Sequence, residues 1–334
     1  MKKILTLLLS VLIVLSCAST AFAAETDKAE TGVFTKTVEV GTGTKYSYRE
    51  IVEKYPEAAE YIYNELKNNY EDYIGLKKGI DVSGFNFSAE DGLALYYGVI
   101  NENPEFYYIR PDTVSYSRNA AKTKLVSIYP IFIFDTLDEI KAANKAIEKS
   151  VKKYLRGVDE SWSDLVKARY LHDMIATNTF YPDIDEENPS EYYEEDTYIN
   201  HCAYGVLVNQ KAVCQGYSHA YALLLKRCGV DVTIVTSSEM NHEWNMVKID
   251  GNYYHVDVTF DDPVYDNLGY VEHTYFMLSG DAFGSDGQHY GWVGEDASDT
   301  TYDNLWFRNV NTVIYRDGNK DYYIDTVESN SGYT

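Results

Sequence analysis

Apolar positions recur at the three-to-four-residue spacing of an amphipathic helix along much of the chain. Over residues 48–69 the pattern is interrupted by Pro56, which predicts one or two helices. A helix is also expected at 88–102, where Ser88 caps the start and an Asn-Pro pair stops the helix. Helical patterning returns at 135–154. The first half of the chain is therefore expected to be rich in helices.

Residues 125–134 are apolar and β-branched, which predicts a strand. Pro130 has no N–H to donate, so the prediction is an edge strand or two short strands. A further helix is expected after Ser161, where Ser161 and Asp164 form a capping box before an apolar helical face. The elements before Ser161 predict a small α+β or mostly helical domain over 46–160, and the helix after Ser161 opens a second region.

The second half of the chain changes to a buried helix followed by strands. Residues 213–227 have the length and apolar pattern of a buried helix, and the Cys-Gly pair that follows is suited to end it. Strands are expected at 230–236, 243–249 and 252–260. Asp250-Gly251, a strong turn signal, joins the last two strands into a hairpin.

The first residues have the form of an export signal. Two lysines precede a short apolar run that ends in the small-x-small site Ala21-Phe22-Ala23, so residues 1–23 are expected to be a signal peptide. Residues 24–45 lack periodicity and are expected to be a flexible leader. The apolar run is shorter than the roughly 20 residues of a membrane span, so a transmembrane protein is not expected. The prediction is a secreted or cell-surface protein, and a lipid anchor on Cys17 is the weaker alternative because Leu15 fits the lipoprotein pattern poorly.

The chain has 29 basic and 52 acidic side chains, a formal net charge of −23. Residues 1–23 hold two of the lysines and no acid, so the remainder has 27 basic against 52 acidic side chains and a net charge of −25. Such an acidic surface repels phosphate backbones, which argues against a nucleic-acid partner. Residues 182–198 form an acidic loop, which is expected to be solvated, with substrate gating as the alternative.

Three cysteines follow the predicted signal peptide: Cys202, Cys214 and Cys228. An odd number leaves at least one thiol without an intramolecular partner in an oxidising compartment. Cys202 and Cys228 are open to two readings, as buried thiols or as a disulfide pair. Cys214 lies at the start of the predicted buried helix, and a helix N-terminus and a nearby imidazole both stabilise a thiolate. Cys214 is therefore the candidate nucleophile.

The hairpin supplies the candidate base and the residue that orients it. The turn is expected to close with Ile249 opposite Asn252. This pairing puts His242 opposite Thr259, with Asp257 diagonally beside His242 on the same sheet face. A carboxylate in that place holds an imidazole in one tautomer and stabilises its cation. His242 and Asp257 thus complete a candidate catalytic triad with the cysteine.

His255 is the alternative base, since it shares a strand face with Asp257. A zinc site built on the triad is a weaker reading, because the sequence has no short-spaced pair of structural-zinc ligands. We therefore expect no metal and no cofactor. The remaining histidines are expected to be packed or hydrogen-bonded rather than catalytic: His172, His201, His219, His273 and His289.

The oxyanion of an acyl-transfer reaction needs two donors, and the backbone N–H of Cys214 is the natural first one. The candidates for the second donor are Tyr204, Asn209 and Gln210. For each of them an ordinary role is the stronger reading: Tyr204 as a packing residue, and Asn209 and Gln210 as turn residues.

The residues around the candidate triad carry a resemblance to a known family. The stretches are Ala203-Tyr204-Gly205, Ala212-Val213-Cys214-Gln215-Gly216-Tyr217, His242-Glu243-Trp244-Asn245 and Tyr254-His255-Val256-Asp257-Val258-Thr259. Together they closely resemble the bacterial transglutaminase-like (transglutaminase/protease-like) superfamily over about residues 162–280. Two departures are visible, because Glu243 stands where the family often has a small residue and Phe260 where it often has tryptophan. Outside the core, the stretches 103–107 and 275–279 resemble the extended clostridial-type version of such proteins.

The resemblance implies an α+β fold with a papain-like core, in which the cysteine helix packs on an antiparallel sheet. We expect this catalytic domain at 161–285, after the N-terminal domain at 46–160 and before a C-terminal extension at 286–334.

The implied activity is acyl transfer on peptide or protein amides through a cysteine thioester. The enzyme would be a cysteine peptidase or amidase, or a protein-glutamine transglutaminase, and cell-wall peptide is among the candidate substrates. Hydrolysis is the first expectation, because the chain has no room for the additional domains of the animal transglutaminases. An adhesin-like binding module is the alternative, in which an N-terminal domain rich in the chain's 33 tyrosines carries the function. A scaffold that has lost its activity is a third reading.

Overall fold

The computed structural model describes residues 33–37, 46–182, 197–262, 270–305, 308, 310–317 and 320–327. The predicted signal peptide, Cys17 and residues 183–196 of the acidic loop lie outside the described residues. Within the described part of the chain, no helix has both the length and the apolar character that crossing a membrane requires.

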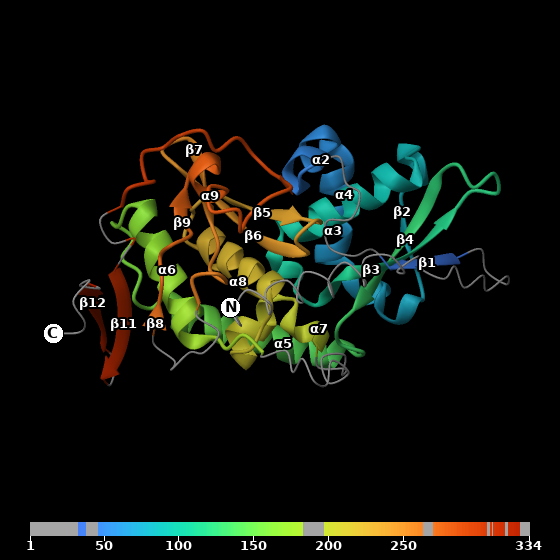
Figure 1. Ribbon diagram of the computed structural model, residues 1–334. Coiled ribbons are helices and arrows are strands. Elements are labelled where there is room, and N and C mark those ends of the chain that lie inside the picture. The colour runs from blue at the N-terminus through green and yellow to red at the C-terminus, as the bar shows by residue number, and fades with distance from the viewer. Residues whose placement is uncertain are drawn as a thin grey trace, which may run out of the picture.

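The chain combines helices with antiparallel sheets, so the fold is α+β (Figure 1). The helices of four or more residues are α2 (Tyr48–Lys54), α3 (Pro56–Asn68), α4 (Ala89–Glu102), α5 (Leu137–Leu155), α6 (Asp164–Asn178), α7 (Thr197–Asn200), the π-turn η6 (Gly205–Asn209), α8 (Cys214–Arg227) and α9 (Gly280–Phe283). The strands are β1 (Val33–Thr37), β2 (Ile80–Asp81), β3 (Ile109–Arg118), β4 (Leu125–Phe132), β5 (Val232–Ser237), β6 (His242–Ile249), β7 (Asn252–Val256), β8 (Tyr270–Val271), β9 (Phe276–Leu278), β10 (Trp292–Val293), β11 (Val310–Asp317) and β12 (Lys320–Val327).

The predicted N-terminal helices are present, and their caps explain their starts. Pro56 occupies the first turn of α3, where its missing N–H costs nothing, so the pattern over 48–69 gives two helices. The Ser88 hydroxyl accepts the N–H of Asp91 at the start of α4, as expected of an N-cap. Thr136 and Glu139 form a reciprocal capping box that starts α5.

The N-terminal sheet corrects two expectations. Its strand order is β1-β3-β4-β2, so β4 is an inner strand rather than an edge. Pro130 is tolerated because β2 pairs only with Ser127 and Ile128, so that Pro130 has no partner in β2. In addition, β1 lies inside the segment expected to be a flexible leader, and it pairs antiparallel with β3 across about 80 residues of sequence.

Helix α6 begins two residues later than its predicted capping box. The N-cap is Ser163, whose hydroxyl accepts the N–H of Val166. Ser161 instead bonds the carboxylate of Asp159 in the preceding turn. Ser161 and Ser163 are both residues that can cap a helix, so the local sequence does not distinguish the two starts. The packing of the apolar face of α6 favours the start at Ser163.

The second sheet has the strand order β10-β5-β6-β7-β9 and is antiparallel. The predicted hairpin register is confirmed, because Ile249 pairs with Asn252. The ladder ends at Asn245 and Val256, so β7 is four residues shorter than expected and Thr259 never pairs with His242. The strand stops there because the side chain of Asp257 accepts the N–H groups of the residues that follow it.

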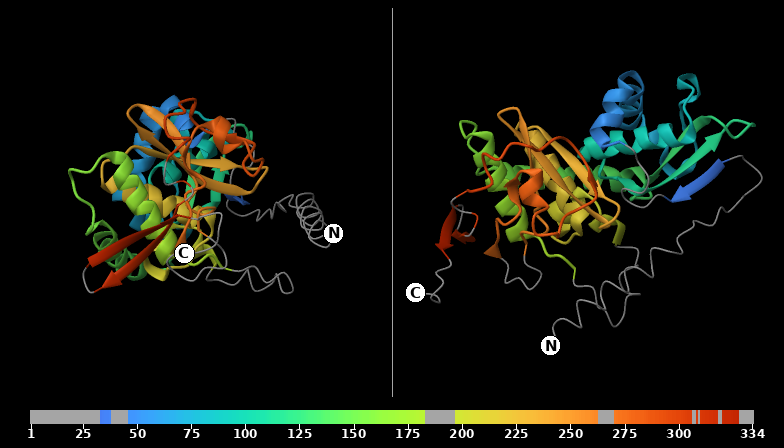
Figure 2. Two further views of the ribbon diagram at one scale, coloured as in Figure 1. Left: turned by 60° about the vertical axis from the view of Figure 1, so that its left-hand side comes forward. Right: turned by 45° about the horizontal axis from the view of Figure 1, so that its top comes forward.

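Helix α8 packs on one face of this sheet and α6 packs behind α8, as the two views in Figure 2 also show. Residues of β6 alternate between the faces: the side chain of Asn245 donates to the carbonyl of Ser218 on α8, whereas Trp244 belongs to a smaller core on the opposite face with Phe283 of α9. The main core is continuous from the N-terminal helices through α5, α6 and α8 to the sheet. The C-terminal hairpin β11–β12 pairs with β8 and also contacts α6, at the end away from the N-terminal region (Figures 1 and 2).

Candidate active site

Cys214 is the first residue of α8, as the sequence predicted. The preceding residue, Val213, is extended and offers no side chain to cap the helix. The free backbone N–H groups of the first turn and the helix dipole therefore act on the cysteine. Its side chain is half-buried and its thiol is free.

His242 bridges the cysteine and the aspartate. Its Nε2 donates to Asp257 Oδ2 at 2.6 Å, and the ring also shares a hydrogen bond with Cys214. Because Nε2 is occupied by the carboxylate, Nδ1 is the nitrogen that faces the thiol. Burial alone would lower the pKa of His242, but the charges of Asp257 and Cys214 and the two hydrogen bonds raise it well above its usual range.

Asp257 is fully buried and accepts hydrogen bonds on both oxygens. Oδ1 accepts the backbone N–H groups of Thr259 (3.0 Å) and Phe260 (3.1 Å). Burial would raise the pKa of Asp257, but the His242 cation and the hydrogen bonds from His242 and His289 hold it well below its usual range. The carboxylate therefore stays ionised and fixed in place behind the imidazole.

Aromatic rings enclose His242 on two sides. The indole of Trp244 stacks on the imidazole with 27° between the ring planes and 5.6 Å between the centroids, and the ring of Phe260 lies at 4.9 Å. Trp244 is buried, whereas Phe260 is 38% exposed and forms part of the surface beside the site. The arrangement leaves His242 only 8% exposed. The three predicted residues thus lie together in one largely buried site.

Comparison with known proteins bears on this arrangement. The model of the transglutaminase-like superfamily matches residues 152–258, which include Cys214, His242 and Asp257. The chain carries a transglutaminase-like domain. No curated protein matches the sequence. A solved structure described as "Crystal structure of a TGase" is 21% identical over 37% of this chain and 33% of that chain, with a TM-score of 0.30. This chain therefore spans about a third of that protein's length.

The matched segment begins within α5 and ends one residue after Asp257, so the transglutaminase-like domain contains α6, α8 and the strands β5 to β7. This confirms the family resemblance and the α+β core with a cysteine helix on an antiparallel sheet. The extended clostridial-type resemblance and the limits of the flanking domains stay predictions.

A second imidazole contacts the aspartate, which the sequence did not reveal. His289 Nε2 donates to Asp257 Oδ2 at 2.9 Å, the same oxygen that binds His242. His289 precedes β10 and was expected to be merely packed or hydrogen-bonded. No local pattern marks it, because the contact joins residues 32 apart in the sequence.

His255, the alternative base, lies elsewhere in the transglutaminase-like domain. It is fully buried, accepts the indole N–H of Trp244 on Nδ1 at 3.0 Å and stacks on Phe283. Burial and, to a lesser degree, His289 lower its pKa to about 3. Of the two candidate bases, His242 is the one that the structure places against Asp257.

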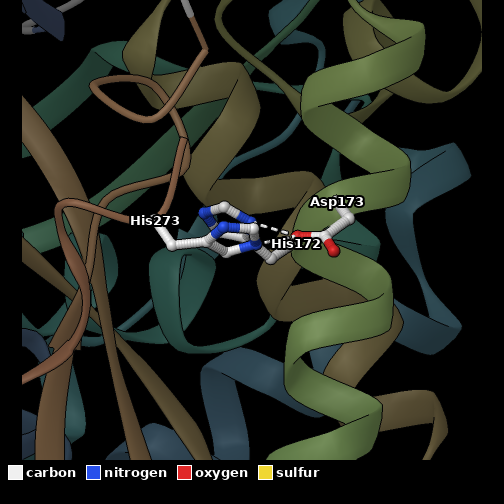
Figure 3. A group of neighbouring side chains, drawn as sticks. All are labelled: His172, Asp173 and His273. Atoms are coloured by element: carbon white, nitrogen blue, oxygen red, sulfur yellow. Dashed lines mark hydrogen bonds and ion pairs between the residues drawn. The ribbon is translucent and has the colours of Figure 1, made fainter. Parts of the chain in front are cut away.

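A separate buried cluster joins α6 to the segment that follows β8 (Figure 3). His172 on α6 shares its Nδ1 proton with Asp173 (2.9 Å) and its Nε2 proton with Asp261 (3.1 Å). His273, which follows β8, donates to the same oxygen of Asp173 at 2.8 Å, and its ring stacks on that of His172. Asp261 belongs to the turn that starts at Asp257, since its backbone N–H bonds the carbonyl of Asp257. The cluster therefore fastens that turn to α6.

The charges in this cluster depend on His172. Burial alone would lower the pKa of His172, but the hydrogen bonds to Asp173 and Asp261 and their charges raise it to about 9. Burial would raise the pKa of Asp173, yet the two imidazoles lower it to about 2. Burial raises the pKa of Asp261, and the His172 cation offsets only part of that. At neutral pH, His172 is thus a cation between two carboxylates.

Among the described residues, two groups bring His and Asp ligand atoms close enough to share a metal ion: His172 with Asp173 and His273, and His242 with Asp257 and His289. In both groups the imidazole nitrogens point at one carboxylate oxygen at hydrogen-bond distance. Protons on those nitrogens account for both arrangements without an ion.

The other predicted residues have structural surroundings. Tyr204 stacks on Tyr107 and packs on Phe134. Asn209 ends the π-turn η6, and Gln210 follows it with a left-handed φ of 57°, which suits a turn residue. The second oxyanion donor remains a prediction among these three residues.

Cys202 and Cys228 are both free thiols, so the disulfide reading is not realised in this structure. Cys202 is buried and donates to the carbonyl of Ile199, and burial raises its pKa to about 12. Among these cysteines, the one in contact with an imidazole is Cys214.

Gly216 allows the start of α8 to lie against residues 200–202. A Cβ at this position would meet the carbonyl oxygen of Asn200 at 2.4 Å and the Cβ of Ala212 at 2.7 Å. Gly216→Ala should therefore lower the free energy of unfolding by about 1–3 kcal/mol, although alanine favours a helix by about 1 kcal/mol over glycine. Urea unfolding measures this effect. Gly84→Ala is the control, because a Cβ there meets nothing within 4 Å, and equal stability of the two variants would contradict the prediction.

Proposed function

We propose that the chain is a thiol enzyme that transfers acyl groups from peptide or protein amides, with Cys214 as nucleophile, His242 as proton carrier and Asp257 as the residue that orients His242. The observation that carries the proposal is the continuous chain of contacts from Cys214 through His242 to Asp257. The segment matched by the family model contains all three of these residues.

The place of Cys214 at the start of α8, in contact with His242, supports a thiolate–imidazolium pair as the resting state. In the first half-reaction, the Cys214 thiolate attacks the carbonyl carbon of the substrate amide and forms a C–S bond. His242 then gives its proton to the departing nitrogen as the C–N bond breaks, which leaves a thioester on the cysteine.

In the second half-reaction, neutral His242 removes a proton from the acceptor as the acceptor attacks the thioester carbonyl. Water as acceptor gives a carboxylic acid, and the enzyme is then a peptidase or amidase. A lysine amine gives a new amide, and the enzyme is then a transglutaminase. The C–S bond breaks in either case and returns the thiolate–imidazolium pair.

An activated ester tests the proposal without knowledge of the natural substrate. Wild-type protein treated with p-nitrophenyl acetate should carry an acetyl group on the peptide that contains Cys214, and Cys214→Ala should release nitrophenol only at the background rate. Adding an alkylamine then shows whether the thioester passes to the amine or to water. Acetylation spread over lysines, with equal nitrophenol release from both proteins, would contradict the proposal.

One observation favours a second candidate function, that of a binding module. A groove of about 540 Å³ lies between the start of α3 and the start of α4, lined in part by Tyr55, Phe85 and Phe87. Its rings are suited to bind an extended polymer. Unchanged binding of cell-wall material by the Cys214→Ala variant, together with a loss of binding in Phe85→Ala, would support this function over the enzymatic one.

We also propose that the protein is exported, which rests on the sequence of residues 1–23 alone. The mass of the intact protein recovered from culture medium or from membranes distinguishes cleavage after Ala23 from a lipid on Cys17. Recovery from the cytoplasm with residues 1–23 still attached would contradict export.

A further inference from the structure

We propose that His289 is a positioning residue of the site: a second imidazole that shares Asp257 Oδ2 with His242 and fixes the carboxylate so that His242 keeps facing Cys214. The effect on reaction rate rests on the proposed function. The hydrogen-bonded clamp itself does not.

The two bonds to Asp257 Oδ2 define the clamp. His242 Nε2 lies 2.6 Å and His289 Nε2 lies 2.9 Å from this oxygen. A carboxylate oxygen only accepts, so both nitrogens carry protons. With Thr259 and Phe260 bonded to Oδ1, the carboxylate is held by four donors and cannot turn without losing at least two.

The two ring nitrogens of His289 have different surroundings. Nε2 donates to Asp257 Oδ2, whereas Nδ1 is buried and has no hydrogen-bond partner among the described residues. The bond to Asp257 is therefore the hydrogen bond that holds this ring within the described part of the chain.

The ring of His289 is locked by its neighbours. It is 1% exposed, and its centroid lies 4.0 Å from that of Phe283, 4.6 Å from Phe260 and 4.7 Å from Tyr275. The next residue is also anchored, because its carbonyl accepts the hydroxyl of Ser237. Such a donor is held in place before substrate arrives, as catalytic preorganisation requires.

Sharing one oxygen between two donors has an electrostatic consequence. The ionisable groups that face His242 are Cys214 on α8, Asp257 after β7 and His289 before β10. When His289 donates to Oδ2, less of the carboxylate's negative charge is left to stabilise the His242 cation. Removal of His289 should therefore raise the pKa of His242, so that its cation persists to higher pH. The removal should also let the ring of His242 turn away from Cys214.

Two substitutions separate donation from packing. His289→Leu removes the donor, and His289→Gln keeps an N–H of similar reach. His289→Phe is the second apolar variant if the leucine variant does not fold. His255→Leu is the matched control, because His255 belongs to the same aromatic cluster but is bonded to Trp244 and not to Asp257.

The first readout is the titration of the His242 ring by NMR. The pKa of His242 should rise in His289→Leu, return toward the wild-type value in His289→Gln, and stay unchanged in His255→Leu. The second readout is alkylation of Cys214, which should slow by about 10- to 100-fold in His289→Leu, the equivalent of one hydrogen bond to a charged group. His289→Gln should recover most of this loss.

An unchanged His242 titration in both apolar variants would overturn the clamp, and so would equal slowing in the leucine and glutamine variants without a shift in that titration. Failure of the proposed function looks different: Cys214 in the wild-type protein would then react no faster than in His242→Ala, whatever occupies position 289.

Discussion

Asp257→Asn should slow acylation of Cys214 by about 10³- to 10⁴-fold while the chain still folds. The amide has one oxygen and one NH₂ group. The backbone N–H groups of Thr259 and Phe260 can only donate, so the amide oxygen must face them. The NH₂ group then faces the two imidazoles. To accept from it, His242 must move its proton to Nδ1, which is the wrong nitrogen because it faces the cysteine.

The nitrophenyl ester assay measures this rate, and urea unfolding separates it from instability. Asp262→Asn is the matched control, because Asp262 lies in the same turn and is also buried, but accepts the hydroxyl of Tyr217 rather than an imidazole. A rate for Asp257→Asn close to that of the control would mean that Asp257 does not set the tautomer of His242.

The second large effect concerns stability. His172→Leu should lower the free energy of unfolding by about 3–5 kcal/mol, because it leaves the carboxylates of Asp173 and Asp261 buried without the cation between them. Adding Asp261→Asn to this variant should recover part of the loss, since it removes one of the two buried charges, whereas Asp173 keeps its contacts with His273 and Arg169. If the single variant were as stable as the wild type in urea unfolding, the cluster would not fasten the Asp257 turn to α6.

The same residue predicts a pH dependence. The folded pKa of His172 is about 9, above its usual value of 6.5, so its stabilising contribution is complete below about pH 6.5 and is lost as the pH rises through 9. A shift of this size corresponds to about 3 kcal/mol. The difference in unfolding free energy between wild type and His172→Leu should shrink over that interval. A difference that stays constant from neutral pH to about pH 10 would contradict the assignment.

The parts of the fold that short-range signals determine could be predicted from the sequence. Asp250-Gly251 specified the hairpin and its register, Ser88 specified the start of α4, and the apolar pattern after Cys214 specified α8. The contact between His242 and Asp257 followed from the same hairpin, although the ladder ends before it reaches them.

The parts that depend on distant contacts could not be predicted. Strand β1 pairs with the edge of β3 far along the chain. Its five residues favour a strand, but they are too few to stand out from the Thr-, Gly- and charge-rich segment around them. The pairing of His172 with Asp261 joins residues 89 apart, and that of His289 with Asp257 joins residues 32 apart. A single sequence contains no periodicity that reports such contacts. The early end of β7 likewise depends on the hydrogen bonds that the Asp257 side chain accepts from the backbone of Thr259 and Phe260.

The central claim is that Cys214 and His242 work as a pair, and the rate of alkylation of Cys214 by iodoacetamide as a function of pH tests it most directly. Peptide mass spectrometry follows Cys214 and the half-buried Cys228 in the same sample, so Cys228 serves as an internal control. The pKa of an unperturbed thiol is about 8.5. In the wild type, Cys214 should react with iodoacetamide well below that pH, and much faster than Cys228. His242→Ala should remove that advantage. If Cys214 reacts as slowly as Cys228 in both proteins, the two residues are not a catalytic pair.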